Sequence, residues 1–152
     1  GSSLAAQEEI GLCWRGRRGG RGVVCVPQSV AYHLGGGTLP QGNPRKTFLN
    51  FRNNLLLLYK NLPDERLAKV MHLRFWLDAL ASVQFMLTMQ WGSFLAVWKA
   101  RRAFHEMKED FRKDREENLS KTILSPVPEQ SCFSLLWQYY AKGRKTFNQL
   151  YK

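Results

Sequence analysis

Two neighbouring carboxylates near the start of the chain have the chemistry of a general base. Glu8 and Glu9 lie in residues 4–15, LAAQEEIGLCWR, whose apolar spacing predicts a short helix. Adjacent side chains on a helix point about 100° apart, so at most one of the two faces a given pocket. One carboxylate beside a sugar hydroxyl can take its proton as the oxygen attacks. The same pair also suits the first turn of a helix, where negative charge is favourable, and both interpretations stay open.

A single histidine stands between an apolar segment and a glycine-rich loop. His33 ends residues 30–33, which are expected to be extended, and precedes three glycines at 35–37. Those glycines allow the backbone to approach a ligand closely. A neutral imidazole in such a place can bind a divalent metal or contact a diphosphate. The alternative is a polar end to the extended segment, without a ligand.

A basic cluster follows at the start of a predicted helix. Arg45 and Arg52 are seven residues apart and are therefore expected to share a helix face, with Lys46 on a neighbouring edge. Two guanidiniums near a helix N-terminus favour a phosphate-bearing ligand. A solvated basic face explains the same pattern. Each group is a weak signal alone, whereas the order of carboxylate, strand, histidine, glycine loop and basic helix is more specific.

The elements that would position these groups are a turn, a strand, a loop and a helix. Residues 15–22, RGRRGGRG, predict a cationic turn, although tracts of this kind also bind RNA. Residues 23–26, VVCV, are apolar and β-branched between a glycine and a proline, which predicts a buried strand. Residues 34–44 predict a loop because two prolines exclude a helix. From Pro44 the apolar spacing is helical, up to an expected end at Asn61.

The rest of the sequence predicts mainly helices. Apolar spacing predicts one over about residues 65–89, capped by Asp64, and another over about residues 93–107. Residues 109–118 are expected to form a solvated charge run. Residues 133–151 predict a last amphipathic helix.

Tryptophans and basic residues alternate in this region as they do at a bilayer interface. Indole rings and cationic side-chain ends settle at the level of the lipid headgroups. The side chains concerned are Trp76, Trp91, Trp98 and Trp137, with Arg74, Lys99, Arg101 and Arg102. The pattern predicts helices that lie on a membrane surface. An ordinary helical core or a dimer interface is the alternative.

The composition favours a folded chain with an anionic partner. In 152 residues, 23 Lys+Arg against 12 Asp+Glu give a formal net charge of +11, and 44% of the residues are hydrophobic. Such a charge attracts phosphates, nucleic acid or acidic lipid. Three cysteines match no zinc or CxxC spacing and are expected to be reduced thiols. The first residues do not predict a signal peptide, and the sequence contains no apolar run of the roughly 18 residues that span a bilayer. Because it opens with Gly1 inside a predicted helix, it is expected to be a fragment.

Together these segments resemble the C-terminal part of bacterial family 2 glycosyltransferases, of the type found in Bacteroidetes-like organisms. The resemblance runs through EEIGLCWR, a basic glycine-rich turn, and VVCVPQSVAYHLGGGTLPQGNPRKTFLNFRNNLLLLYKNLP. It continues in the tail through LRFWLDALASVQFMLTMQWGSFLAVWKARRAF and SPVPEQSCFSLLWQYYAKGRKTF. It covers nearly the whole chain and is stronger over residues 23–152 than over the first 22 residues.

This resemblance implies an α/β fold followed by helices. Residues 1–62 would be the C-terminal portion of a GT-A nucleotide-diphosphosugar transferase domain, and residues 63–152 a helical, membrane-associated region. The implied activity is inverting, Mg²⁺- or Mn²⁺-dependent transfer of a sugar from a nucleotide-diphosphate sugar donor to a glycan or lipid-linked acceptor. The implied process is cell-envelope polysaccharide biosynthesis, with the protein peripheral on the cytoplasmic face of the inner membrane.

The resemblance also assigns roles to the residues considered above. Glu9 would be the catalytic base and Glu8 its supporting neighbour, whereas His33 would lie at the metal or the diphosphate. The substrate- or diphosphate-binding residues would be Arg45, Lys46, Arg52 and Asn53, the last two matching the family's RN element.

The chain departs from the family pattern in three places, one of which is Ser2-Ser3-Leu4, where the family has bulky, often aromatic residues. Gly11 stands where the family usually has an aspartate, and no aspartate precedes Asp64, so the DxD metal motif is absent from this chain. The chain alone is therefore not expected to bind a nucleotide sugar well or to be active. The alternative function is a non-enzymatic basic helical module that binds anionic membrane lipid or RNA. For the transferase, no nucleic-acid partner is expected.

Overall fold

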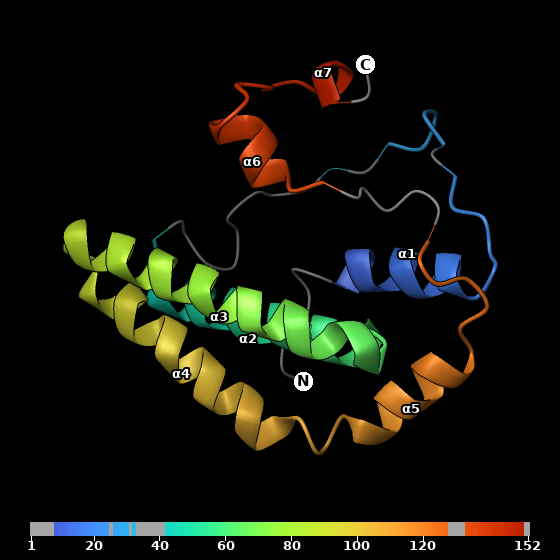
Figure 1. Cartoon of the computed structure of the whole chain (residues 1–152), viewed down its shortest axis with the longest axis horizontal. Helices are drawn as coiled ribbons and strands as arrows, with labels where there is room; N and C mark the ends of the chain where they lie inside the picture. The colour runs from blue at the N-terminus through green and yellow to red at the C-terminus, as the bar shows by residue number, and fades with distance from the viewer. Residues whose placement is uncertain (1–7, 25, 31, 33–41, 128–132, 151–152) are drawn as a thin grey trace.

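A computed structural model of the chain describes residues 8–24, 26–30, 32, 42–127 and 133–150. Within these residues the regular secondary structure is entirely α-helical (Figure 1). The helices are α1 (Glu8–Arg18), α2 (Pro44–Asn61), α3 (Asp64–Leu87), α4 (Trp91–Met107), α5 (Arg112–Ser120), α6 (Leu135–Tyr140) and α7 (Phe147–Leu150).

The predicted α/β fold is wrong for this part of the chain, because the described residues contain no strand. The buried strand predicted at residues 23–26 shows the reason. Val23, Val24 and Val26 are 52%, 83% and 55% exposed and lie in irregular backbone. A strand is stable only when neighbouring strands satisfy its backbone and cover one of its faces. The described residues provide no such neighbour, so β-branched side chains alone do not make a strand here, and the GT-A architecture implied for residues 1–62 is not found.

Helix α2 begins and ends where the sequence predicts. The Oδ1 atom of Asn43 accepts a hydrogen bond from the backbone N–H of Arg45 at 2.8 Å, and Pro44 occupies the first turn, where an N–H has no helical partner. Asn61 is the last residue of the helix, and Pro63 follows two residues later. These local signals are strong enough to define the helix independently of its neighbours.

The core lies where α2 packs along α4, with α3 and α5 beside them (Figure 1). Leu55 and Leu56 of α2 are almost fully buried against Phe104 of α4. The rings of Tyr59 and Phe104 meet edge to face, with their centroids 6.0 Å apart. Four partly buried residues surround this cluster, namely Tyr59, Met71, Met107 and Phe111. α2 is therefore the helix around which α3, α4 and α5 assemble.

One arginine from the predicted charge run closes the C-terminal end of α2. Arg115 of α5 is 6% exposed, and its Nη1 donates hydrogen bonds to the carbonyl oxygens of Tyr59 and Leu62, the latter at 2.7 Å. Its Nη2 forms an ion pair with Asp64 at the start of α3. The guanidinium satisfies carbonyls that the helix itself leaves unpaired. The prediction of a solvated run is therefore wrong at this residue.

Three predicted boundaries differ from the observed ones. α1 continues into the predicted turn at residues 15–22 and ends in a cluster of basic side chains, which are favourable at a helix C-terminus. The N-cap of α3 is Pro63, and Asp64 lies within the first turn instead of capping it. The single helix predicted over residues 133–151 is divided into α6 and α7. Gly143 lies between those two helices with a φ of 64°, a conformation that interrupts a helix.

Candidate membrane interface

Helix α3 fully buries only polar side chains, although Met71 also packs against the core, and it exposes large apolar side chains on its outer side. Its fully buried residues are Asp78 and Ser82. The opposite side exposes large apolar residues at helical spacings of three and four, which are Leu73, Trp76, Leu80, Val83 and Leu87, 44% to 75% exposed. In a helix that lies between a protein core and water, the apolar stripe faces the core. α3 is reversed, and it presents a continuous apolar stripe to its surroundings.

A group of ion pairs fixes the inner side of α3. The carboxylate of Asp78 lies 2.7 Å from Nη1 of Arg101, on α4, and 2.7 Å from Nε of Arg74. The guanidinium of Arg74 lies over the ring of Phe51, and that of Arg101 over the ring of Phe75, at 5.3 and 5.0 Å from the centroids. Rotating α3 would break the ion pair between Asp78 and Arg101, which is costly because the carboxylate of Asp78 is buried. The ion pair on the buried side of α3 therefore determines in which direction the apolar stripe faces.

Helix α4 extends the apolar surface. Trp91, Leu95 and Trp98 recur at spacings of four and three, and they are 51%, 52% and 38% exposed. The ring of Phe75 on α3 contacts both Trp98 and Trp76, with centroid distances of 6.2 and 5.5 Å. The exposed apolar side chains of the two helices thus join into one surface. We call it the hairpin face, and it comprises Leu73, Phe75, Trp76, Leu80, Val83, Leu87, Met89, Trp91, Leu95 and Trp98.

The turn between α3 and α4 is short and exposed. Thr88 caps the end of α3, and the backbone N–H of Gln90 donates to the carbonyl of Phe85 at 2.8 Å. Met89 adopts a positive φ of 58°, which reverses the chain within one residue. The turn lies at one end of the helical assembly, at the left in Figure 1. The side chains of Leu87 and Met89 are 75% and 71% exposed, so the tip of the hairpin presents apolar groups.

None of the described helices combines the length and the hydropathy that crossing a bilayer requires. The hairpin face is nevertheless bordered by cations. Lys99 and Arg102 follow Trp98 on the exposed side of α4. Nε of Arg102 donates to Oε1 of Glu106 at 2.8 Å, and this hydrogen bond, with the negative charge of Glu106, raises the pKa of Arg102. Arg101 instead turns inward to the ion pair, so the basic cluster of the sequence is divided between the surface and the interior.

Two of the residues predicted to bind substrate contact each other instead of solvent. Nε and Nη2 of Arg52 lie 3.1 and 3.0 Å from Oδ1 of Asn53, and the guanidinium covers the ring of Phe48 at 5.3 Å. Both residues are buried. Arg45 is exposed in the first turn of α2, and Lys46 is half-buried. The helix face that Arg45 and Arg52 were expected to share is therefore not a common solvent-facing surface.

The remaining predicted site residues lie outside what the structure describes. Glu8 and Glu9 begin α1, but their side chains are not described, and neither is any part of His33. The assignment of a base and of a metal or diphosphate ligand to these residues stays a prediction. Among the described residues, no three His, Cys, Asp or Glu side chains gather closely enough to hold a metal ion.

Only some of the residues that shape the hairpin face could be predicted from the sequence. Asp78 follows Arg74 by four residues, a spacing that predicts an ion pair on a helix. The apolar stripe of α3 is also visible as a spacing of three and four, but that pattern normally indicates a core-facing side. Arg115 stands among other charged residues, and nothing in the sequence distinguishes it from them.

Comparisons with known proteins give no match, whether with family models, curated proteins or solved structures. The chemistry of the hairpin face is that of an amphipathic surface, apolar at its centre and tip and cationic at its border. Such a surface can bury its apolar part among lipid acyl chains while the cations meet anionic headgroups.

Proposed function

We propose that the α3–α4 hairpin attaches this protein to the surface of an anionic membrane. The observation that carries the proposal is the reversal of α3, which buries Asp78 and Ser82 and exposes five large apolar residues. Apolar patches of this extent mark interaction surfaces in soluble proteins. The tryptophans within the face and the cations at its border favour a lipid headgroup region over a purely apolar partner.

The expected free energy of membrane binding is that of reversible attachment. Fully burying one large apolar side chain is worth about 1.5–3 kcal/mol. Leu87, Met89 and Trp91, at the tip, are at least half exposed and would be covered first. Each cation near an anionic surface adds about 1 kcal/mol. Lys99 and Arg102 are both placed to contribute.

Co-sedimentation with lipid vesicles tests this proposal. The chain should bind vesicles of mixed phosphatidylcholine and phosphatidylglycerol more strongly than phosphatidylcholine alone. Added salt should weaken the binding without abolishing it, because salt screens the charges and leaves the apolar contribution intact. A chain that binds neither vesicle and sediments as a dimer would refute the proposal and assign the hairpin face to contact between two copies.

As a second function we propose glycosyl transfer, supported by the resemblance of the sequence to family 2 glycosyltransferases. Glu9 would take the proton of an acceptor hydroxyl as its oxygen attacks the anomeric carbon of the donor. Arg45 and Lys46 would offset charge on the departing diphosphate. A divalent metal ion, when bound, neutralises diphosphate charge in such reactions. The membrane-bound hairpin would bring this chemistry to a lipid-linked acceptor.

Turnover of a nucleotide sugar by the longest polypeptide that the gene encodes tests the second proposal. Glu9→Gln should abolish transfer and leave donor affinity nearly unchanged, because the amide cannot accept the proton. Glu109→Gln, which changes the same charge on an exposed residue, should retain full activity. Normal turnover by the Glu9 variant would refute its role as base. A wild-type protein that neither binds nor transfers a sugar would leave membrane attachment as the function.

A further inference from the structure

The tetrapeptide Arg-Lys-Thr-Phe occurs twice in the chain, at residues 45–48 and 144–147. Within it, Thr47 and Thr146 are the only serine or threonine residues of the sequence that directly follow two basic residues. Basophilic protein kinases select this charge pattern, because acidic side chains in their substrate groove pair with the cations. The two copies offer the same local chemistry, so their places in the fold distinguish them.

The first copy lies where two helices pack closely. The backbone N–H of Thr47 donates to the carbonyl of Asn43 at 3.2 Å, in the first turns of α2. Its hydroxyl lies 3.5 Å from Oγ of Ser93 on α4, a residue that is 2% exposed. A Cβ added at the neighbouring Gly92 would lie 2.6 Å from the ring of Pro44, so the two helices are in close contact here. An enzyme can reach the hydroxyl of Thr47 only when α2 and α4 separate.

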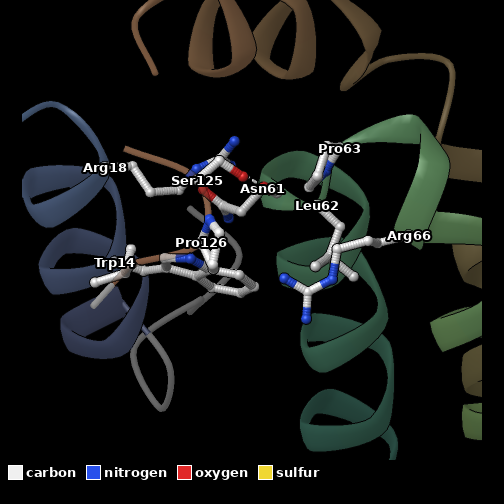
Figure 2. A pocket seen from close by; sticks show the side chains of 9 residues that line it. Trp14, Arg18, Asn61, Leu62, Pro63, Arg66, Ser125 and Pro126 are labelled. Atoms are coloured by element: carbon white, nitrogen blue, oxygen red, sulfur yellow. Dashed lines mark hydrogen bonds between the residues drawn. The ribbon is translucent and has the colours of Figure 1, made fainter. Parts of the chain in front are cut away.

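The second copy lies beyond the point where the chain leaves the packed helices. Figure 2 shows Pro126 beside Trp14 and Ser125 beside Asn61, at the joint between the ends of α1 and α2. The enclosed space at this joint is about 10 Å³, which holds about one water molecule, so the joint is tightly closed. After it, α6 and α7 lie apart from α2, α3 and α4 (Figure 1). Helices of six and four residues are marginal on their own, so this segment opens more easily than the core.

The second copy is exposed, in backbone without regular secondary structure ahead of α7. Lys145 and Thr146 are exposed, and Arg144 is half-buried. The backbone N–H groups of Lys145 and Thr146 donate to Oε1 of Gln149 at 2.9 and 3.2 Å, and that of Arg144 donates to the carbonyl of Gln138 at 2.9 Å. These bonds are local, and breaking them does not disturb the packing of α2 against α4. The segment can therefore enter the groove of an enzyme while the core stays folded.

We propose that Thr146 is a phosphorylation site for a basophilic serine/threonine protein kinase, and that Thr47 is not. The Oγ1 atom of Thr146 attacks the γ-phosphorus of ATP, and the bond from that phosphorus to the bridging oxygen breaks. ADP leaves, and the proton of the hydroxyl passes to the catalytic aspartate of the kinase. The product carries about −1.5 to −2 charges beside the cations Lys142, Arg144 and Lys145. The site includes no residue of the hairpin face and does not rest on membrane attachment or on sugar transfer.

Incubation of the full chain with purified basophilic kinases and ATP, followed by mass spectrometry of the digested protein, tests the proposal. Phosphate should appear on Thr146 at least about ten times faster than on Thr47, because only the latter requires the core to open. Synthetic peptides of residues 41–50 and 140–149 serve as references without the fold. The two peptides should be phosphorylated at similar rates, since both contain the same four residues.

Two variants test recognition of the cations. Arg144→Gln should slow phosphorylation of Thr146 about tenfold, the effect of losing one charge-assisted pair with the kinase. Lys113→Gln, which removes an exposed cation from α5, is the matched control and should change the rate by less than about twofold. Three results would overturn the site. They are no phosphate on Thr146, equal rates at Thr47 and Thr146 in the folded chain, and equal rates for the two variants.

Discussion

Replacement of one leucine at the tip of the hairpin tests membrane attachment most directly. Leu87 is 75% exposed at the end of α3, so Leu87→Gln removes little from the folded core. Ile123 offers a matched control, because it is also 75% exposed but lies beyond α5, away from the hairpin face. The two substitutions remove similar apolar areas from water-exposed positions. Only the first should change the affinity for lipid.

The expected loss follows from the area that the membrane would cover. Full burial of a leucine side chain is worth about 1.5–3 kcal/mol. Because about three quarters of Leu87 is exposed in the free protein, covering it contributes about 1–2 kcal/mol. Every 1.4 kcal/mol changes a dissociation constant about tenfold. Leu87→Gln should therefore weaken vesicle binding about 5- to 30-fold, and Ile123→Gln should leave it within about twofold.

Equilibrium co-sedimentation over a range of lipid concentrations would measure both affinities, and chemical denaturation would confirm that each variant keeps the wild-type stability. Equal losses for the two variants would mean that the chain binds lipid through general hydrophobicity. An unchanged affinity for Leu87→Gln would refute insertion of the hairpin tip. A shift in sedimentation from dimer to monomer for Leu87→Gln alone would instead identify the face as a contact between copies.

Three further substitutions and one control, Gly16→Ala, test the helical assembly by chemical denaturation. Asp78→Ala should lower the free energy of unfolding by about 1–3 kcal/mol, because it leaves two partly buried guanidiniums without their carboxylate. Arg115→Met should cost about 1.5–3 kcal/mol through the loss of its hydrogen bonds to the end of α2. Gly92→Ala should cost about 1–3 kcal/mol, since a Cβ there would lie 2.6 Å from the ring of Pro44. Gly16→Ala has open space and should stabilise by about 0.4–1 kcal/mol.

If any of the first three variants keeps the wild-type free energy of unfolding, the contact that its substitution removes or crowds does not stabilise the fold. For Asp78 it would mean that the ion pairs do not set the orientation of α3. For Gly92 it would mean that α2 and α4 can separate at that point without cost. The Gly16 variant serves as the control for helix propensity, because both glycines lie within helices and only one of them faces a neighbour.

The sequence by itself determined the helices whose ends carry local signals. The asparagine before Pro44 caps α2, and the proline two residues after Asn61 stops the chain from continuing it. The extents of α3 and α4 were also close to those expected from apolar spacing. Such signals act between residues a few positions apart, and they need no partner from elsewhere in the chain. The roles of Glu9 as a base and of His33 at a metal or diphosphate have no such local support and remain predictions.

The tertiary structure decided which side of each helix is inside. The sequence left open whether the apolar residues of α3 face a core or a membrane surface. Asp78 turns them outward, because its carboxylate meets Arg101 across the interface with α4. Arg115 is also buried by distant partners, since the carbonyls that accept its hydrogen bonds lie more than fifty residues earlier in the chain. The apolar residues at 23–26 stay exposed because a strand needs a neighbour that the described residues do not supply. Burial and strand pairing depend on partners from distant segments of the chain, and the spacing of residues within one segment does not predict those partners.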